Sequence, residues 1–88
     1  MPKQKNDEPP QFYTRLPVLR TERGMSRREL AEAVGVHYQT IGYLERGEYS
    51  PSLVLALMIA EALGVPLGAA FSLTPFPSMA DQIYNEGR

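Results

Sequence analysis

Three polar or aromatic side chains between residues 38 and 43 are unusual for the surface of a helix. Tyr38, Gln39 and Tyr43 fall on one side of a short segment whose other side carries Ile41 and Leu44. A merely solvated helix face would carry Lys, Glu and Ala instead. A glutamine amide pairs in bidentate fashion with N6 and N7 of adenine, and an aromatic ring can contact the methyl group of thymine. These three residues therefore predict a helix face that reads the base edges of double-stranded DNA.

Residues around this face suit contact with phosphate. Arg46 near the helix end and the hydroxyl of Thr40 are candidates. Gly42 either lets the backbone approach a groove closely or is a tolerated defect that costs about 1 kcal/mol of helix stability. His37, just before the helix, caps it imperfectly or contacts phosphate, and no nucleophile or acid motif accompanies it. We therefore expect no catalytic residues and no enzyme activity.

A second short helix must position this face. Ser26 and Glu29 have the spacing of a capping box, which predicts a helix that begins just after Ser26. Gly35 stands where such a helix turns left-handed and ends. The inward face between them carries three apolar residues, Leu30, Ala31 and Val34. The two helices around this corner have the order of a helix-turn-helix unit, whose second helix enters the major groove.

These residues resemble the Cro/phage-repressor type of helix-turn-helix regulators, the Xre-like family. The resemblance is carried by Ala31 at the helix contact, Gly35 at the turn, and Ile41 and Leu44 as inward residues. It extends to the segments 19–26, 45–53 and 59–65 and covers roughly residues 14–73. It implies an all-α, five-helix, lambda-repressor-like DNA-binding domain.

The resemblance also implies roles for residues outside the unit. The family places an arginine of the first helix against a glutamate at the end of the second helix of the unit, and the matching residues are Arg20 and Glu45. The family's loop along the phosphate backbone matches residues 47–51, so Tyr49 and Ser50 are candidate phosphate contacts. The family usually carries glutamine where Arg27 stands. Arg27 either reads guanine or holds phosphate, and phosphate is the favoured interpretation.

Capping signals predict the remaining helices. Thr14 as N-cap would start the first helix, to about Arg23, and leave Pro17 in its first turn. Ser50-Pro51 or Ser52 would start a helix over residues 53–63, and residues 66–71 form a short fifth helix. We expect the fourth helix to fill the core with six apolar residues. These are Leu53, Ala56, Leu57, Ile59, Ala60 and Leu63.

An apolar pair on the fourth helix predicts a contact with another segment or another chain. Val54 and Met58 lie one turn apart where related sequences carry charge, and such a face must be covered. The cover is either a second copy of the chain or the tail, in which Met79, Ile83 and Tyr84 have helical spacing. A frayed tail is the alternative.

Composition limits the class of protein. We divide the 88 residues into a flexible arm (1–11), one domain (12–73) and a C-terminal tail (74–88) that is a candidate dimer contact. The chain has no cysteine and a single histidine, so we expect no metal site and no cofactor. No apolar run is long enough to span a bilayer and no secretory signal is visible, which favours the cytoplasm. The net charge of −1 argues mildly against a generic polyanion binder, although residues 14–51 carry six arginines and five glutamates.

The function that these features predict is sequence-specific binding to double-stranded DNA as a homodimeric transcriptional regulator, and a repressor in particular. One recognition helix reads only a few base pairs, so two copies would read half-sites of a near-palindromic operator. The alternative is an adaptor or antitoxin-like module that binds another protein and for which DNA is secondary. An enzyme is the third class, and no cluster of acid, base or metal ligands supports it.

Overall fold

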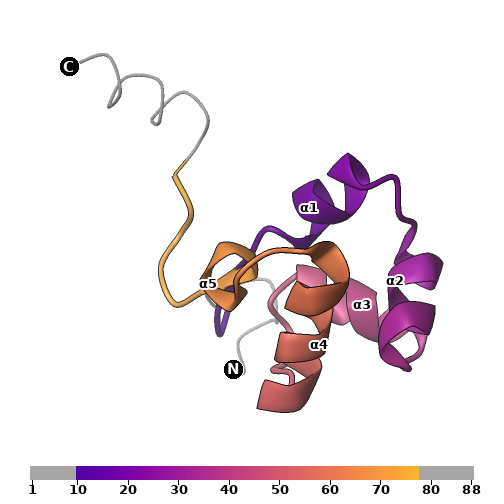
Figure 1. Ribbon diagram of the computed structural model, residues 1–88. Helices are drawn as coiled ribbons and strands as arrows, with labels where there is room; N and C mark the ends of the chain where they lie inside the picture. The colour runs from indigo at the N-terminus through magenta and orange to yellow at the C-terminus, as the bar shows by residue number, and fades with distance from the viewer. Residues whose placement is uncertain (1–9, 78–88) are drawn as a thin grey trace, which may run out of the picture.

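Five short helices and one pair of two-residue strands make up the described part of the chain. The computed structural model describes residues 10–77. In Figure 1 the short α5 lies beside the N-terminal end of the described chain, and the contacts place α2 against both α3 and α4. In chain order the elements are β1 (Tyr13–Thr14), α1 (Leu16–Glu22), α2 (Arg27–Val34), α3 (Tyr38–Glu45), α4 (Leu53–Leu63), α5 (Leu67–Ala70) and β2 (Phe71–Ser72).

The start of α1 differs from the sequence prediction. Arg15, not Thr14, is the N-cap residue, and it makes no side-chain cap, although Pro17 does lie in the first turn. Thr14 is in β1, where it pairs with Phe71 of β2 in antiparallel register. The Thr14 hydroxyl is buried and makes no hydrogen bond, so it caps no backbone N–H of α1 and the N-cap prediction was wrong.

The caps of α2 and α3 fix the corner between them. The capping box is confirmed: Ser26 Oγ accepts from the backbone N–H of Glu29 at 3.0 Å, and the Glu29 carboxylate accepts from the N–H of Ser26 at 2.9 Å. These bonds lower the pKa of the Glu29 carboxyl below its usual value. Gly35 ends α2 with φ of +77°, and His37 Nδ1 accepts from the N–H of Gln39 at 3.1 Å. Both ends of the turn are therefore set by local hydrogen bonds.

The core lies between the helices, and four of the six α4 residues expected in it are buried there. Leu53 and Leu57, expected inside, are 68% and 48% exposed, so that part of the core prediction was wrong. Because Glu61 is the one polar residue of α4, the sequence gives little indication of which apolar stripe faces α2. The stripe that is buried consists of Ala56, Ile59, Ala60 and Leu63. The core cluster as a whole contains Phe12, Leu16, Leu19, Leu30, Ala31, Val34, Ile41, Leu44, Ile59, Leu63 and Ala70.

The segment before α1 contacts both the segment after α5 and the residue after the α3 C-cap. The Phe12 and Phe71 rings pack with centroids 5.8 Å apart next to the β1–β2 pair. Gln11 N–H donates to the carbonyl of Gly47 at 3.3 Å. A Cβ at Gly47 would lie only 2.7 Å from the carbonyl oxygen of Phe12, and its φ is +69°. Glycine is therefore required directly after the α3 C-cap for both backbone conformation and space.

Several sequence predictions fall on residues that the structure does not describe. These are the first nine residues of the expected arm, and Met79, Ile83 and Tyr84 of the expected tail helix. Within residues 10–77, none of the helices has the length and apolar content needed to cross a membrane. Over the same residues, no three His, Asp or Glu side chains gather as potential metal ligands.

Candidate nucleic-acid interface

The outer face of α3 presents the residues that were predicted to contact DNA bases. Gln39 is exposed at the start of the helix, and Tyr43 is exposed one turn later. Thr40 is half-buried between them along the chain. The inward side of the same helix is fixed by Ile41 and Leu44, which are fully buried. A rigid, well-packed helix therefore carries these side chains outward, which is what reading of a groove requires.

Tyr38 is less free than Gln39 and Tyr43. It is half-buried and packs partly against the core. The Arg28 guanidinium lies 4.0 Å from the centroid of its ring, and the His37 ring lies at 4.6 Å. This contact of Arg28 was not predicted, because no helical periodicity links residues 28 and 38. The stacked guanidinium and ring restrict Tyr38 to one orientation beside the start of α3.

Arg46 and Gly42 lie together at the other end of the face. The Arg46 guanidinium lies 5.2 Å from the centroid of the Tyr43 ring, and its Nε is 3.2 Å from a carboxylate oxygen of Glu48. Gly42 is buried, and a Cβ built on it would lie 3.4 Å from Arg46 Nη1. A methyl group at residue 42 would thus make an ordinary van der Waals contact with the arginine.

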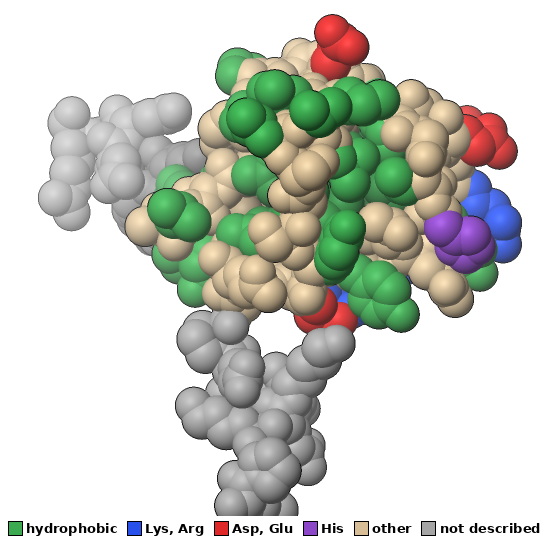
Figure 2. All heavy atoms as spheres, turned by 90° about the horizontal axis from the view of Figure 1, so that it is seen from below, with side chains coloured by type: hydrophobic (Ala, Val, Ile, Leu, Met, Phe, Trp, Pro, Cys, Tyr) green, Lys and Arg blue, Asp and Glu red, His purple; other side chains and the backbone are tan. Residues whose placement is uncertain are grey.

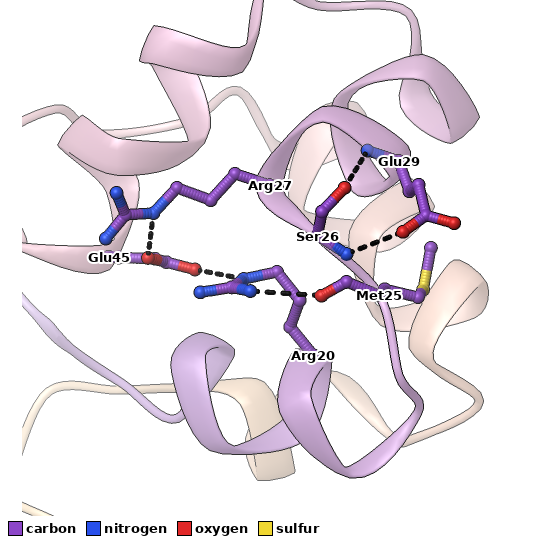
Figure 3. Close-up of polar contacts among 6 residues, drawn as sticks. All are labelled: Arg20, Met25, Ser26, Arg27, Glu29 and Glu45. Carbon is purple, nitrogen blue, oxygen red and sulfur yellow. Dashed lines mark hydrogen bonds and ion pairs between the residues drawn. The ribbon is translucent and has the colours of Figure 1, made fainter.

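Glu45 lies between two arginines at the C-terminal end of α3 (Figure 3). Arg20 Nε from α1 donates to Oε2 at 2.8 Å, and Arg27 Nε from α2 donates to Oε1 at 2.8 Å. A terminal nitrogen of Arg20 also donates to the carbonyl of Met25 at 3.0 Å. The Glu45 side chain is only 3% exposed. One buried carboxylate therefore joins α1, α2 and α3 at the point where the helix dipole disfavours its charge.

The contact of Arg27 with Glu45 was not predicted. Arg27 was expected to contact DNA alone, and a separation of 18 residues gives no local signal for this hydrogen bond. The Arg27 side chain is 51% exposed, whereas that of Arg20 is 15% exposed. Arg20 is thus the buried partner of Glu45, and Arg27 is the partner on the surface.

A hollow of about 190 Å³ opens on this surface between the start of α2 and the outer face of α3. It brings together most of the residues predicted to contact DNA. Its lining residues are Arg27, Tyr38, Gln39, Gly42, Tyr43 and Arg46. With two guanidinium groups, an amide and two phenol rings, the hollow is rich in hydrogen-bond donors and suits a ligand rich in acceptors.

The loop between α3 and α4 contributes further polar groups. Tyr49 and Ser50 are exposed in this loop. Ser52 Oγ accepts from the N–H of Leu55 at 3.1 Å and caps α4, which decides between the two predicted helix starts. The loop is therefore held at both ends, by Gly47 and by the cap of α4.

A separate apolar surface lies on α4. Val54 is 65% exposed and Met58 is 41% exposed, and Leu53 and Leu57 are exposed beside them. Seen from below, hydrophobic side chains make up much of the visible surface, and basic side chains are confined to its margin (Figure 2). A cluster of exposed large apolar residues of this kind is typical of a surface that contacts protein.

The comparisons with known proteins agree with this geometry. The Helix-turn-helix family model HTH_3 matches residues 19–69, more than half of the chain. An uncharacterised HTH-type transcriptional regulator of Methanothermobacter thermautotrophicus is 62% identical over 45 residues, which cover 51% of this chain and 65% of that protein. Another from Archaeoglobus fulgidus is 43% identical over 58 residues, covering 66% of this chain and 83% of that protein.

A solved structure supports the same assignment. The restriction-modification controller protein C.AhdI from Aeromonas hydrophila is 38% identical, with a TM-score of 0.59 over 62% of this chain and 83% of that one. The predicted family and the five-helix fold are thereby confirmed, with the addition of the small strand pair. The chain belongs to the HTH_3 family of helix-turn-helix, DNA-binding transcriptional regulators.

Proposed function

We propose that the protein is a sequence-specific regulator that binds double-stranded DNA as a homodimer and represses transcription by occupying a near-palindromic operator. The observation that carries this proposal is the outer face of α3, where exposed Gln39 and Tyr43 lie beside Arg46 around one hollow. Side chains of this kind on a rigid helix can donate to acceptors on base edges and phosphates in the major groove.

The proposed contacts divide into two groups. Gln39, Tyr43 and the accessible part of Tyr38 would read base edges, since they lie at the start and along the outer side of α3. The phosphate contacts would come from the flanks of this face. They are Arg46, Thr40, Tyr49 and Ser50. Arg20 and Glu45 would act indirectly, by holding α3 at a fixed angle to α1.

The homodimer would form through the apolar surface of α4. Val54 and Met58 lie one turn apart on this surface. A two-fold axis at this surface would bring the same residues of two copies together. Such a dimer would hold two α3 helices for two half-sites, whose centres lie about 34–36 Å apart on B-DNA. The dimer would thus double the number of base pairs that are read.

Selection from a random duplex library tests this proposal. The full-length protein is used at low salt and again at high salt, because phosphate contacts weaken with salt while discrimination between bases persists. We expect an enriched inverted repeat whose half-site centres lie about 10 base pairs apart. Enrichment of no duplex at either salt concentration would refute the proposal.

A second candidate function has one observation in its favour. The apolar surface of α4 would equally serve an adaptor or antitoxin-like module that binds a different protein, and the net charge of −1 gives little general attraction for DNA. Light scattering of the purified protein separates the two: a dimer in isolation supports the regulator. A monomer that binds no duplex supports the adaptor.

A further inference from the structure

Arg27 lies in the wall of the hollow proposed to bind DNA and forms an ion pair with Glu45. This second ion pair is not needed to neutralise the charge of Glu45. Arg20 already neutralises Glu45 and is the more buried of the two arginines. Arg27 adds a second positive charge to a single carboxylate, so this group of three residues carries a net charge of +1. The surplus charge lies at the surface, in the wall of the hollow.

The hydrogen bond to Glu45 determines which edge of the Arg27 guanidinium remains available. It uses Nε, and the two terminal nitrogens make no contact with the other residues drawn in Figure 3. A planar guanidinium fixed through Nε presents its terminal N–H groups as a pre-oriented fork. Two acceptors spaced like O6 and N7 of guanine fit such a fork, and so do two oxygens of a phosphate.

The surroundings of Arg27 favour the base over the phosphate. Its neighbours in the hollow include Gln39 and Tyr43, which are exposed on the outer face of α3. Buried Gly42 also lines the hollow and adds no side chain that would fill it. The exposed loop residues Tyr49 and Ser50, which were assigned to the DNA backbone, are not part of this hollow, and Arg46 is the one assigned phosphate contact that shares it with Arg27.

We propose that Arg27 is a specificity-determining residue that reads one guanine in each half-site, with Glu45 as its positioning residue. This inference rests on the proposed function, and it replaces the phosphate contact that the sequence favours for Arg27. Each terminal nitrogen donates one hydrogen bond, one to O6 and one to N7 of the same guanine. Preference for guanine at that base pair is the expected consequence.

The test uses the duplex enriched by selection, with each guanine replaced in turn by 7-deazaguanine. This replacement removes the N7 acceptor and leaves every phosphate in place. For the wild-type protein we expect one guanine in each half-site at which the replacement weakens binding by about 5-fold to 150-fold. Arg27→Ala should bind the replaced and the natural duplex equally at that position.

Arg27→Lys is the matched variant, because it keeps the positive charge and loses the planar fork. We expect its preference for guanine to be weaker than that of the wild type, because a lysine ammonium can reach O6 or N7 without the rigid fork, while its salt dependence of binding stays near that of the wild type. Thermal unfolding of both variants identifies any loss that comes from folding, and Arg27→Lys still serves if Arg27→Ala unfolds.

The outcomes separate the two proposals. If wild-type protein binds an enriched duplex but no 7-deazaguanine position depends on residue 27, the guanine contact is refuted and the regulator stands. Arg27→Ala could instead weaken binding to all duplexes alike and lower the slope of log K against log salt concentration by about one. Arg27 would then be a phosphate contact, which also overturns the inference. If the wild-type protein binds no duplex, both proposals fail.

Discussion

The outer surfaces of α3 and α4 differ in chemistry although both helices bury an apolar stripe in the same core. The surface of α3 carries an amide and phenol rings with arginines beside them, whereas that of α4 carries Leu53, Val54, Leu57 and Met58. The first is rich in hydrogen-bond donors and suits a polar, anionic partner. The second has nothing to donate and suits a surface that excludes water. We therefore propose different partners for the outer surfaces of α3 and α4.

The two helices are also held in different ways. Glu45 ties α3 to α1 and α2 through two ion pairs, and His37 caps its start. In α4 the inward stripe is uniformly apolar and Ser52 caps the helix. Directional bonds fix the angle of α3, as reading of a base sequence requires. Non-directional packing is sufficient for α4.

Removal of Arg20 should produce the largest effect, because it leaves Glu45 buried with only its surface partner. We expect Arg20→Ala to lower the free energy of unfolding by about 3 kcal/mol, the lower end of the range for breaking a buried pair. Arg27→Ala should cost less than about 1 kcal/mol, since that side chain is half-exposed. Urea unfolding measures both variants. Equal losses of unfolding free energy in the two variants would show that Arg20 and Arg27 stabilise Glu45 to the same extent.

A charge on the α4 surface should affect the dimer and leave the α3 face intact. We expect Val54→Asp to weaken self-association by about 2–3 kcal/mol, because a two-fold axis places the new carboxylates near one another. Val18→Asp is the control, since Val18 is an exposed apolar residue on α1. Analytical ultracentrifugation gives the association constants. An unchanged constant for Val54→Asp would remove α4 from the dimer interface.

Substitutions on α3 should separate base reading from phosphate contact. Gln39→Ala should cost about 1–3 kcal/mol of binding and relax the preference at one base pair. Arg46→Ala should weaken binding to all sequences alike and lower the slope of log K against log salt concentration by about one. Fluorescence anisotropy with the selected duplex and its single-base variants measures both. Loss of preference in Arg46→Ala, with none in Gln39→Ala, would reverse the assignment.

Substitution of Gly42 by alanine tests whether the hollow on the α3 surface is needed for DNA binding. Gly42→Ala should raise the free energy of unfolding by about 0.5–1 kcal/mol, because alanine favours the helix and its methyl group makes only an ordinary contact with Arg46. The same variant should bind the selected duplex more weakly. Greater stability with unchanged affinity would show that the glycine is a tolerated defect and not part of the recognition surface.

The smallest effect concerns the capping box that starts α2. Because folding lowers the pKa of Glu29, its ionised form adds stability above the unfolded-state pKa, and this contribution is lost as the pH falls through the folded-state pKa. Glu29→Gln keeps an acceptor for the Ser26 N–H without the charge. The Tm difference between wild type and variant should narrow as the pH falls below about 4.3. A constant difference between pH 7 and pH 3 would argue against this linkage.

Local signals in the sequence predicted much of the fold. The Ser26–Glu29 spacing located the start of α2, and Gly35 and Gly64 located the ends of α2 and α4. Each signal works because a cap is satisfied by residues within one turn of it. Strands of two residues, such as β1 and β2, are too short to produce an alternating pattern, and they were missed.

The site was predictable only where periodicity fixes a face. Gln39 and Tyr43 were assigned to the outer face of α3 because Ile41 and Leu44 define its inner face. In α4 every residue except Glu61 is apolar, so periodicity did not define a face and Leu53 and Leu57 were wrongly assigned to the core. The stacking of Arg28 on Tyr38 joins residues from different helices, and no rule of spacing predicts such a contact.

The central claim is that the outer face of α3 lies in the major groove while α4 joins two copies. Protection of guanine N7 from methylation on the selected duplex tests it most directly, because N7 is accessible only from the major groove. The account predicts protection in two patches whose centres lie about 10 base pairs apart. Protection confined to adenine N3 in the minor groove, or the absence of any protected base in a bound duplex, would contradict it.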